Sequence, residues 1–390
     1  MVYNFDETVD RRNTNCEKWD NCAERFGQSD LLPLWVADMD FKTPDFIINA
    51  LKQRLEHEVL GYQIRPASFY NAVANWLQQR GWTIDPQKIS FSPGVVPAIN
   101  FAVNVFTNPG DKVLINTPVY HPFMYAVNNH GRTLVKSSLV DSGNGYYTID
   151  FDDFERKLAN GVKMFIMCSP HNPVGRVWTL DELTKIGELC LKYNVLIISD
   201  EIHSDLVFAP HKHTYLASIC EEFANQTVTF IAPSKTFNVA GLSSSIVYSD
   251  NCALHEQFSK YLNRLSVSAG TIFGDIALEA AYTHGDSWLS QLLEYLSGNC
   301  EYVVDYLKNY IPQIKARKPE GTYLMWLDCR GLNMTMSQIH EFLTSKAGIA
   351  LNPGRIFGDE GEQFVRLNIA TQRSILAEAM DKLRNAMKQM

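Results

Sequence analysis

Short apolar segments of β-strand length recur through the middle of the chain and alternate with helix-like patterns. The segments expected to be strands are residues 112–116, 132–139, 163–168, 195–199, 227–232 and 245–248. Several of them are apolar at nearly every position, which is typical of parallel strands covered on both faces. Because parallel strands need crossover connections, the alternation predicts an α/β domain built on a mainly parallel sheet.

Helix signals fall before and between these strands. Helices are expected over residues 43–61 and 68–80, the first opening at Thr43-Pro44 and the second stopping at Gly81. The clearest helix signal is the capping-box sequence Thr179-Leu-Asp-Glu182, which predicts a helix to about residue 193.

The last third of the chain has a different character. Residues 251–310 are predicted to be almost entirely helical, and a strand (323–329), a helix (337–346), a strand (365–369) and a closing helix follow. We therefore expect a large α/β domain over residues 45–285. Residues 1–44 and 286–390 are expected to form a smaller α+β domain.

Composition excludes several classes of function. The 43 acidic residues outnumber the 35 Lys and Arg, so the net charge of −8 gives no basis for binding nucleic acid. No apolar run approaches the ~20 residues of a membrane span, and the first residues do not resemble a secretory signal. The eight scattered cysteines contain no CxxC pair and indicate reduced thiols in a cytoplasmic protein. No metal site is predicted, either at His211-Lys-His213, expected to be a solvated loop, or at Asp38-Met-Asp40, expected to be a structural turn.

Three predicted strands end in polar groups of different chemistry. Residues 163–168 are followed by Asn172, 195–199 by Asp200, and 227–232 by Ser234-Lys235. Since open parallel sheets bind ligands beyond the carboxyl ends of their strands, an amide, a carboxylate and an amine are expected to meet at one site.

This set of groups suits pyridoxal 5′-phosphate (PLP). A lysine can bond the cofactor aldehyde and later move protons, and a carboxylate keeps the pyridine nitrogen protonated. An amide can donate a hydrogen bond to the phenolic oxygen. The segment Ser92-Pro-Gly94-Val95-Val96 precedes a predicted helix over 97–106, and its free N–H groups are suited to a phosphate.

In their order and spacing, Asn172, Asp200 and Ser234-Lys235 resemble the corresponding residues of the fold-type-I PLP enzymes, the aspartate-aminotransferase superfamily. Within it, three segments are similar to those of MalY/PatB-type C–S lyases, the cystathionine β-lyases. These segments are Leu32-Pro-Leu-Trp-Val-Ala-Asp-Met-Asp-Phe41, Thr117-Pro-Val-Tyr-His-Pro-Phe123 and Ala232-Pro-Ser-Lys-Thr-Phe-Asn-Val-Ala-Gly-Leu242. The resemblance covers essentially the whole chain and implies the PLP-dependent transferase-like fold.

The resemblance assigns roles residue by residue. Lys235 matches the lysine that bonds the cofactor and acts as general base, and Tyr120, also expected to be catalytic, matches the aromatic residue stacked on the ring. Asp200 matches the partner of the pyridine nitrogen and Asn172 the donor to the phenolic oxygen. The implied phosphate contacts are Gly94, Val95, Val96, Ser234 and Tyr62, with Tyr62 reaching the site of a neighbouring subunit in a homodimer.

Arg366 lies in a short segment with the alternation of a β-strand. In Val365-Arg-Leu-Asn-Ile369 the apolar residues alternate, so Arg366 and Asn368 share one face of a strand. A guanidinium there can hold a substrate carboxylate through two parallel hydrogen bonds, which also matches the family's substrate-binding arginine. One position departs from the pattern: many aminotransferases of the superfamily have a phosphate-binding arginine where this chain has Ser243.

The resulting hypothesis is a C–S lyase that performs α,β-elimination on a sulfur amino acid to give a thiol, pyruvate and ammonia. An aminotransferase is the alternative, because the same lysine serves both reactions. A catalytically inactive interaction protein is a third reading, disfavoured by the intact set of polar residues. The preferred sulfur amino acid stays open at this point.

Overall fold

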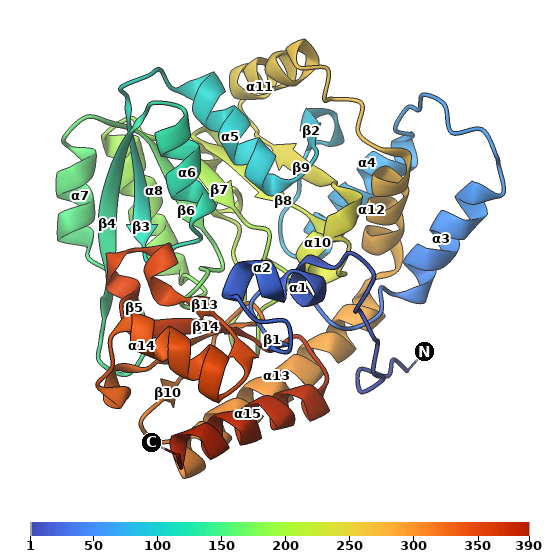
Figure 1. Cartoon of the computed structure of the whole chain (residues 1–390). Helices are drawn as coiled ribbons and strands as arrows, with labels where there is room; N and C mark the ends of the chain where they lie inside the picture. Colours follow the sequence, from blue (N-terminus) through green and yellow to red (C-terminus); the bar gives the residue numbers. More distant parts are fainter. Residues whose placement is uncertain (1, 390) are drawn as a thin grey trace.

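A computed structural model describes residues 2–389 of the chain. Its centre is an eight-stranded sheet with helices on both sides (Figure 1). The strand order is β2-β9-β8-β7-β6-β3-β4-β5. In chain order these strands are β2 (Ile89–Ser92), β3 (Lys112–Thr117), β4 (Thr133–Asp141), β5 (Tyr147–Ile149), β6 (Val162–Cys168), β7 (Leu196–Asp200), β8 (Thr227–Ile231) and β9 (Ser245–Tyr248).

The five inner strands, from β8 through β7, β6 and β3 to β4, are parallel, whereas β9, β2 and β5 run antiparallel to their neighbours. The predicted α/β fold with a mainly parallel sheet is therefore confirmed. All six strands expected from the apolar segments are present within one or two residues of their expected bounds. The short strand β5 was not expected, because its three residues give too short a pattern to detect.

Helices cover the two faces because alternate residues of each strand point to opposite sides. Val113 and Ile115 of β3 pack into the cluster that includes α5, α6 and α11, whereas Leu114 packs against α7, α8 and α9. These helices are α5 (Val95–Phe106), α6 (Pro122–Asn129), α7 (Phe151–Leu158), α8 (Leu180–Lys192), α9 (Glu221–Asn225) and α11 (Cys252–Arg264). The capping box predicted at Thr179 and Glu182 is present at the start of α8.

The helix expected over residues 43–61 is shorter than predicted. It forms α3 (Asp45–Leu55), and the Thr43 hydroxyl donates to the carbonyl of Asn238 instead of capping the helix. Residues 56–66 then form a segment without regular secondary structure that leads to α4 (Ala67–Gln79), which was expected at 68–80. The apolar residues of this segment fit the helical period, but their side chains do not pack on the body of their own chain.

The last third of the chain follows the prediction closely. Three helices, α12 (Ile272–His284), α13 (Asp286–Tyr310) and the preceding α11, account for the helical region. An antiparallel sheet of order β10-β11-β14-β13 comes next, and the expected boundary at residue 285 lies at the junction of α12 and α13. The division of the chain into domains at that point stays a prediction. The remaining elements are α10 (Pro233–Thr236), β10 (Lys315–Ala316), β11 (Leu324–Asp328), α14 (Met336–Glu341), β12 (Ile349–Ala350), β13 (Asn352–Pro353), β14 (Phe364–Asn368) and α15 (Arg373–Met387).

The N-terminal segment packs against this second sheet region. It contains α1 (Glu17–Asp20), α2 (Cys22–Phe26) and β1 (Leu32–Pro33), and β1 pairs in parallel with β12. Residues 35–41 then run from β1 toward the large sheet. Among residues 2–389, no helix combines the length and the apolar character that crossing a membrane requires.

Candidate active site

A cavity of about 180 Å³ lies at the carboxyl ends of the inner strands. It brings together eight of the ten residues predicted for the site, from separate parts of the chain. These eight are Gly94, Val95, Val96, Tyr120, Asn172, Asp200, Ser234 and Lys235. The cavity is also lined by residues that the sequence did not single out for a role, among them Ala37, Cys168, His203, Ser243 and Ser244.

The sheet register explains why three polar groups meet. Cys168, the last residue of β6, pairs with Asp200, the last residue of β7, and Asp200 pairs with Phe230 of β8. The strands therefore end at the same level, and the segments that follow them carry Asn172 and Lys235. Lys235 lies on the single turn of α10, which begins directly after β8 with Pro233 in its first position.

The amine of Lys235 lies close to the N-terminal segment. Its Nζ donates a hydrogen bond of 2.7 Å to the carbonyl oxygen of Ala37. Burial lowers its pKa to about 8, with Asp38 and Asp200 opposing that shift and Arg366 adding to it. A pKa in this range leaves a usable fraction of neutral amine, which a general base requires.

Asp200 is buried, and burial raises its pKa to about 7. The backbone N–H of Ile202 donates to its Oδ1 at 3.1 Å, and this bond together with Lys235 offsets part of the shift. A cationic ring nitrogen next to this carboxyl would favour its ionised form. The protein alone thus contains a buried acid that is suited to a positively charged partner.

Asn172 and Arg366 contact each other directly. Arg366 Nη1 donates to Asn172 Oδ1 at 3.1 Å, and Arg366 Nη2 donates to the carbonyl oxygen of Trp35 at 2.9 Å. Arg366 Nε is buried without a hydrogen-bond partner, and burial lowers the pKa of the guanidinium to about 10. Among residues 2–389 this arginine forms no ion pair with a carboxylate, so its unused donor capacity is suited to an anionic ligand.

The N-terminus of α5 forms another wall of the cavity. Gly94 has a φ of +144° and makes no side-chain cap, so the first N–H groups of the helix, at Val95 and Val96, have no partner within it. The buried hydroxyl of Ser244 is also unpartnered. Free N–H groups at a helix start together with an orphaned hydroxyl are suited to a phosphate, which they can hold without the arginine that Ser243 replaces.

Tyr120 and His203 line the remaining wall. The Tyr120 N–H donates to the Asn172 carbonyl at 3.0 Å, and burial raises the pKa of its phenol. The Nδ1 atom of His203 is buried and unpartnered, and burial lowers the pKa of that ring well below its usual value. Both side chains are therefore uncharged at neutral pH. From the sequence, the position of His203 three residues after Asp200 indicates that it lies close to the site, which the structure confirms, and assigns it no role.

Tyr62 does not reach the cavity of its own chain. It lies in the segment after α3, and its side chain is fully exposed, at 107% of its reference area. Apolar side chains of the same segment, Val59, Leu60 and Ile64, are exposed as well, and so is Leu55 at the end of α3.

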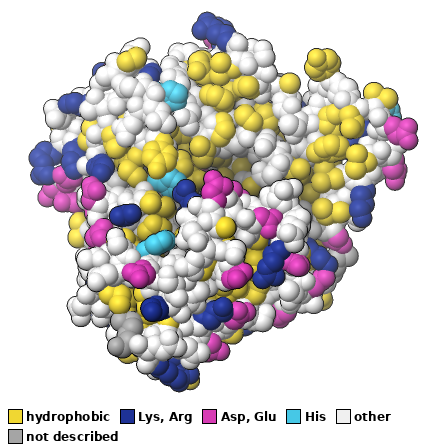
Figure 2. Space-filling view, viewed as in Figure 1, with side chains coloured by type: hydrophobic (Ala, Val, Ile, Leu, Met, Phe, Trp, Pro, Cys, Tyr) yellow, Lys and Arg dark blue, Asp and Glu magenta, His cyan; other side chains and the backbone are white. Residues whose placement is uncertain are grey.

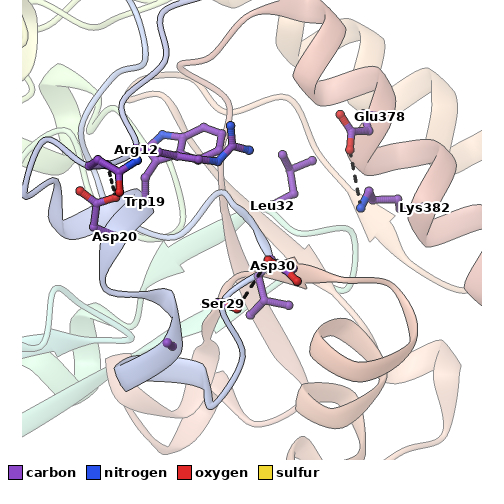
Figure 3. A pocket seen from close by; sticks show the side chains of 11 residues that line it. Arg12, Trp19, Asp20, Ser29, Asp30, Leu32, Glu378 and Lys382 are labelled. Carbon is purple, nitrogen blue, oxygen red and sulfur yellow. Dashed lines mark hydrogen bonds and ion pairs between the residues drawn. The ribbon is translucent and has the colours of Figure 1, made fainter.

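A second hollow lies between the N-terminal helices and α15 (Figure 3). Its lining is largely polar, and its charged groups pair with their own neighbours, as in the Lys382–Glu378 pair at 3.6 Å. None of the predicted site residues lines it, so it is not the candidate site.

No cluster of three metal-ligating side chains occurs among residues 2–389. Asp38 and Asp40 instead form ion pairs with Arg11 and Lys18. The prediction that His211-Lys-His213 is a solvated loop is wrong for His213, whose Nε2 lies 2.6 Å from Oε2 of the buried Glu201.

The fold and the site together define the class: the chain belongs to the class I and II aminotransferase family, whose model matches residues 29–383. It is 42% identical to the cystathionine β-lyase PatB of Bacillus subtilis (strain 168), over 98% of this chain and 100% of that protein. The structure of cystalysin from Treponema denticola, which contains a pyridoxal 5′-phosphate cofactor, has a TM-score of 0.97 at 40% identity and full coverage of both chains. The PLP-bound C–S lyase of Staphylococcus hominis has a TM-score of 0.92 at 32% identity, over 99% of this chain and 98% of that one.

Proposed function

We propose that the chain is a PLP-dependent C–S lyase of the cystathionine β-lyase type, which eliminates a thiol from sulfur amino acids and releases pyruvate and ammonia. The observation that carries the proposal is the meeting of Lys235, Asp200 and Asn172 around one cavity, with Arg366 bonded to Asn172. The names of the relatives described above point to the same chemistry.

The residues present fit PLP. Lys235 would bond its aldehyde, Asp200 would face its ring nitrogen, and the amide nitrogen of Asn172 is free to donate to its phenolic oxygen. The phosphate would lie at the start of α5, near Ser234 and Ser244. When bound, PLP supplies an acceptor for the electron pair that remains when a proton leaves the substrate Cα.

The chain's own groups account for the other requirements of elimination. Arg366 binds the α-carboxylate of the substrate and so orients its Cα–H bond, and the amine of Lys235 removes that proton. Departure of a thiolate from Cβ needs no strong acid, since a thiol has a pKa of only ~8.5. Tyr120 lines the same cavity, and burial raises the pKa of its phenol, so its hydroxyl can serve as a proton donor there.

An aminotransferase would use the same groups up to the loss of the Cα proton. The test is therefore incubation with L-cystathionine in the absence of any keto acid. Sustained release of pyruvate supports the lyase, whereas conversion that stops after one half-turnover per site would establish transamination. In the Lys235→Ala variant, pyruvate release and the visible absorbance of bound PLP should both disappear, and full turnover in that variant would exclude the proposal.

The protein is further proposed to be a homodimer with sites at the interface. The end of α3 and the segment that follows it expose the apolar side chains of Leu55, Val59, Leu60 and Ile64. This part of the chain lies at the edge of the molecule beside α12 (Figure 1), and apolar atoms gather on that side in Figure 2. Exposed apolar surface of this kind is typical of a protein interface. A second copy would cover it and bring Tyr62 to the phosphate end of the neighbouring cavity.

A cytoplasmic location is proposed as well. All eight cysteines are free thiols, and five of them are buried in the core. Reduced cysteines in this number are typical of proteins kept in a reducing compartment.

A further inference from the structure

The carbonyl oxygen of Ala37 accepts two hydrogen bonds on the wall of the cavity. One comes from Lys235 Nζ at 2.7 Å and the other from the hydroxyl of Tyr323 at 2.9 Å. Tyr323 is completely buried and immediately precedes β11. Burial, with Asp38 adding to it, raises the pKa of its phenol well above the usual value, so the hydroxyl is a donor throughout the working pH range.

The backbone before Tyr323 is held in a strained conformation. Thr322 has a φ of +68°, in the left-handed region that a β-branched residue rarely adopts. Three backbone hydrogen bonds hold the segment: Thr322 N–H to Leu206 at 2.7 Å, and Glu320 and Gly321 N–H to the carbonyl of Gly175. Strain of this kind persists only where the surroundings impose it, and it concentrates at functional sites.

Tyr323 and the carbonyl that it contacts are both held in place. The ring of Tyr323 packs edge-on against that of His203, with centroids 6.0 Å apart. On either side of Ala37, the amide of Asn368 donates to the carbonyls of Val36 and Asp38, each at 2.6 Å. The Ala37 oxygen therefore cannot turn away from the cavity without breaking several buried hydrogen bonds.

We propose that Tyr323 is a positioning residue for Lys235, because its hydroxyl and the amine donate to the same carbonyl of Ala37. The hydroxyl thereby sets the position of the amine, and the strength of its hydrogen bond, when the amine is not bonded to the cofactor. This inference deepens the proposed function and rests on it for the role of Lys235. A second donor on one oxygen weakens the hold of that oxygen on the ammonium, which keeps the amine available as a base.

Removing the Tyr323 hydroxyl should therefore strengthen the Lys235–Ala37 hydrogen bond and favour the charged amine. The charged and titratable groups facing Lys235 are Asp38 before α3, Asp200 of β7, His203 beyond β7 and Arg366 of β14. All of them are unchanged by a Tyr323→Phe substitution. No donor is left unsatisfied by it, so the fold should persist.

The first experiment uses the full-length protein freed of cofactor. An amine-reactive reagent labels it over a pH series, and mass spectrometry gives the half-labelling pH of Lys235. In Tyr323→Phe this pH should rise by at least about half a unit, because hydrogen bonding to the charged form raises an amine pKa. Tyr215→Phe is the matched control, since it removes another buried hydroxyl, which donates to Ser204 and does not line the cavity.

An unchanged or lowered half-labelling pH in Tyr323→Phe, or an equal rise in Tyr215→Phe, would overturn the proposal. The labelling needs neither cofactor nor substrate, so its outcome is independent of whether the chain is a lyase.

The second experiment follows exchange of the Cα proton of L-alanine in D₂O with the PLP-loaded protein, because this amino acid has no leaving group and reports the Lys235 step alone. Tyr323→Phe should slow the exchange about fivefold near neutral pH, with KM within twofold of wild type and the pH profile displaced to higher pH. Exchange at the wild-type rate with an undisplaced profile would overturn the positioning role.

Discussion

The guanidinium of Arg366 donates a 3.1 Å hydrogen bond to the side-chain oxygen of Asn172, and this bond links the small antiparallel sheet to the segment after β6 of the large, mainly parallel sheet. It also fixes which end of the amide faces the cavity. Because the oxygen is taken by Arg366, the nitrogen of Asn172 is left as the donor. The residue proposed to bind the substrate therefore also orients a residue proposed to bind the cofactor.

Arg366→Lys should raise KM for the sulfur amino acid about a hundredfold, because an ammonium lacks the planar fork that can hold a carboxylate by two parallel hydrogen bonds while reaching Asn172 and Trp35. The visible absorbance of bound PLP should change too, since Asn172 loses the bond that orients it. Steady-state kinetics and absorbance spectra check both effects. Arg355→Lys, at an exposed arginine of the same region, is the control and should behave as wild type. An unchanged KM in Arg366→Lys would contradict the assignment.

Asp200 makes the stability of the cofactor-free protein depend on pH. Its pKa is raised from 3.8 to about 7 by burial, so the folded state binds more protons than the unfolded state between these values. Stability should accordingly fall as pH rises from 4 to 7, by a few kcal/mol at most. Asp200→Asn cannot ionise and should lose most of this dependence, so that near pH 8 it is more stable than wild type.

Denaturant unfolding of the two cofactor-free proteins at pH 5 and pH 8 measures this effect. Asp359→Asn removes a carboxylate that is 93% exposed and should leave the pH dependence as it is in wild type. If the free energy of unfolding changed equally between pH 5 and pH 8 in wild type and Asp200→Asn, the carboxyl of Asp200 would not be perturbed by burial. Addition of PLP should reduce the loss of stability at pH 8 in wild type, because the ring cation stabilises the carboxylate.

The central part of this site could be predicted because it follows from sheet topology. Strands that run parallel end at one edge, so the residues at and just beyond the ends of β6, β7 and β8 had to converge, and Asn172, Asp200 and Lys235 do. The membership of the family and the fold class were confirmed, whereas the individual roles of these residues stay predictions. Ser244 and Ala37 were not predicted, since an unpartnered buried hydroxyl and a shared backbone carbonyl leave no pattern in a sequence.

Tertiary contacts account for what the sequence patterns missed. The helix expected to reach residue 61 stops at Leu55, because the apolar residues beyond it face away from the chain's own core. His213 was expected in solvent, but a buried carboxylate at Glu201 requires a partner and draws the ring inward. In neither case does the local pattern of apolar and polar residues reveal whether a side chain is buried.

At Gly175, the turn that carries Asn172 packs against the segment that carries Tyr323, and the Gly175 carbonyl accepts hydrogen bonds from that segment. It has a φ of +73°, and a Cβ at this position would lie 2.5 Å from Cβ of Pro319. Gly175→Ala should therefore destabilise the protein by more than about 2 kcal/mol, since it combines left-handed strain with a clash. Gly161→Ala is the control, because its φ of +80° is similar and its Cβ would meet nothing within 4 Å.

Denaturant unfolding of both glycine variants separates the two contributions. Gly161→Ala should lower the free energy of unfolding by about 1 kcal/mol, because only the left-handed backbone is strained there. If Gly175→Ala cost no more than Gly161→Ala, the close packing of the two segments would be disproved.

The proposed dimer can be tested by mixing two inactive variants. Tyr62→Ala loses the side chain that is proposed to reach the neighbouring cavity, and Lys235→Ala loses the proton-transferring amine. In a mixed dimer, the subunit with an intact Lys235 receives an intact Tyr62 from its partner, so one of its two sites is complete. Pyruvate release should therefore return on mixing, after a brief denaturation step that allows subunits to exchange, to about a quarter of the wild-type rate.

A mixture of Lys235→Ala with Asp200→Asn is the control, because both changes fall within one chain's own cavity and mixing should restore no more than the residual activity of Asp200→Asn. If the first mixture stays inactive while its subunits exchange, Tyr62 does not act across the interface.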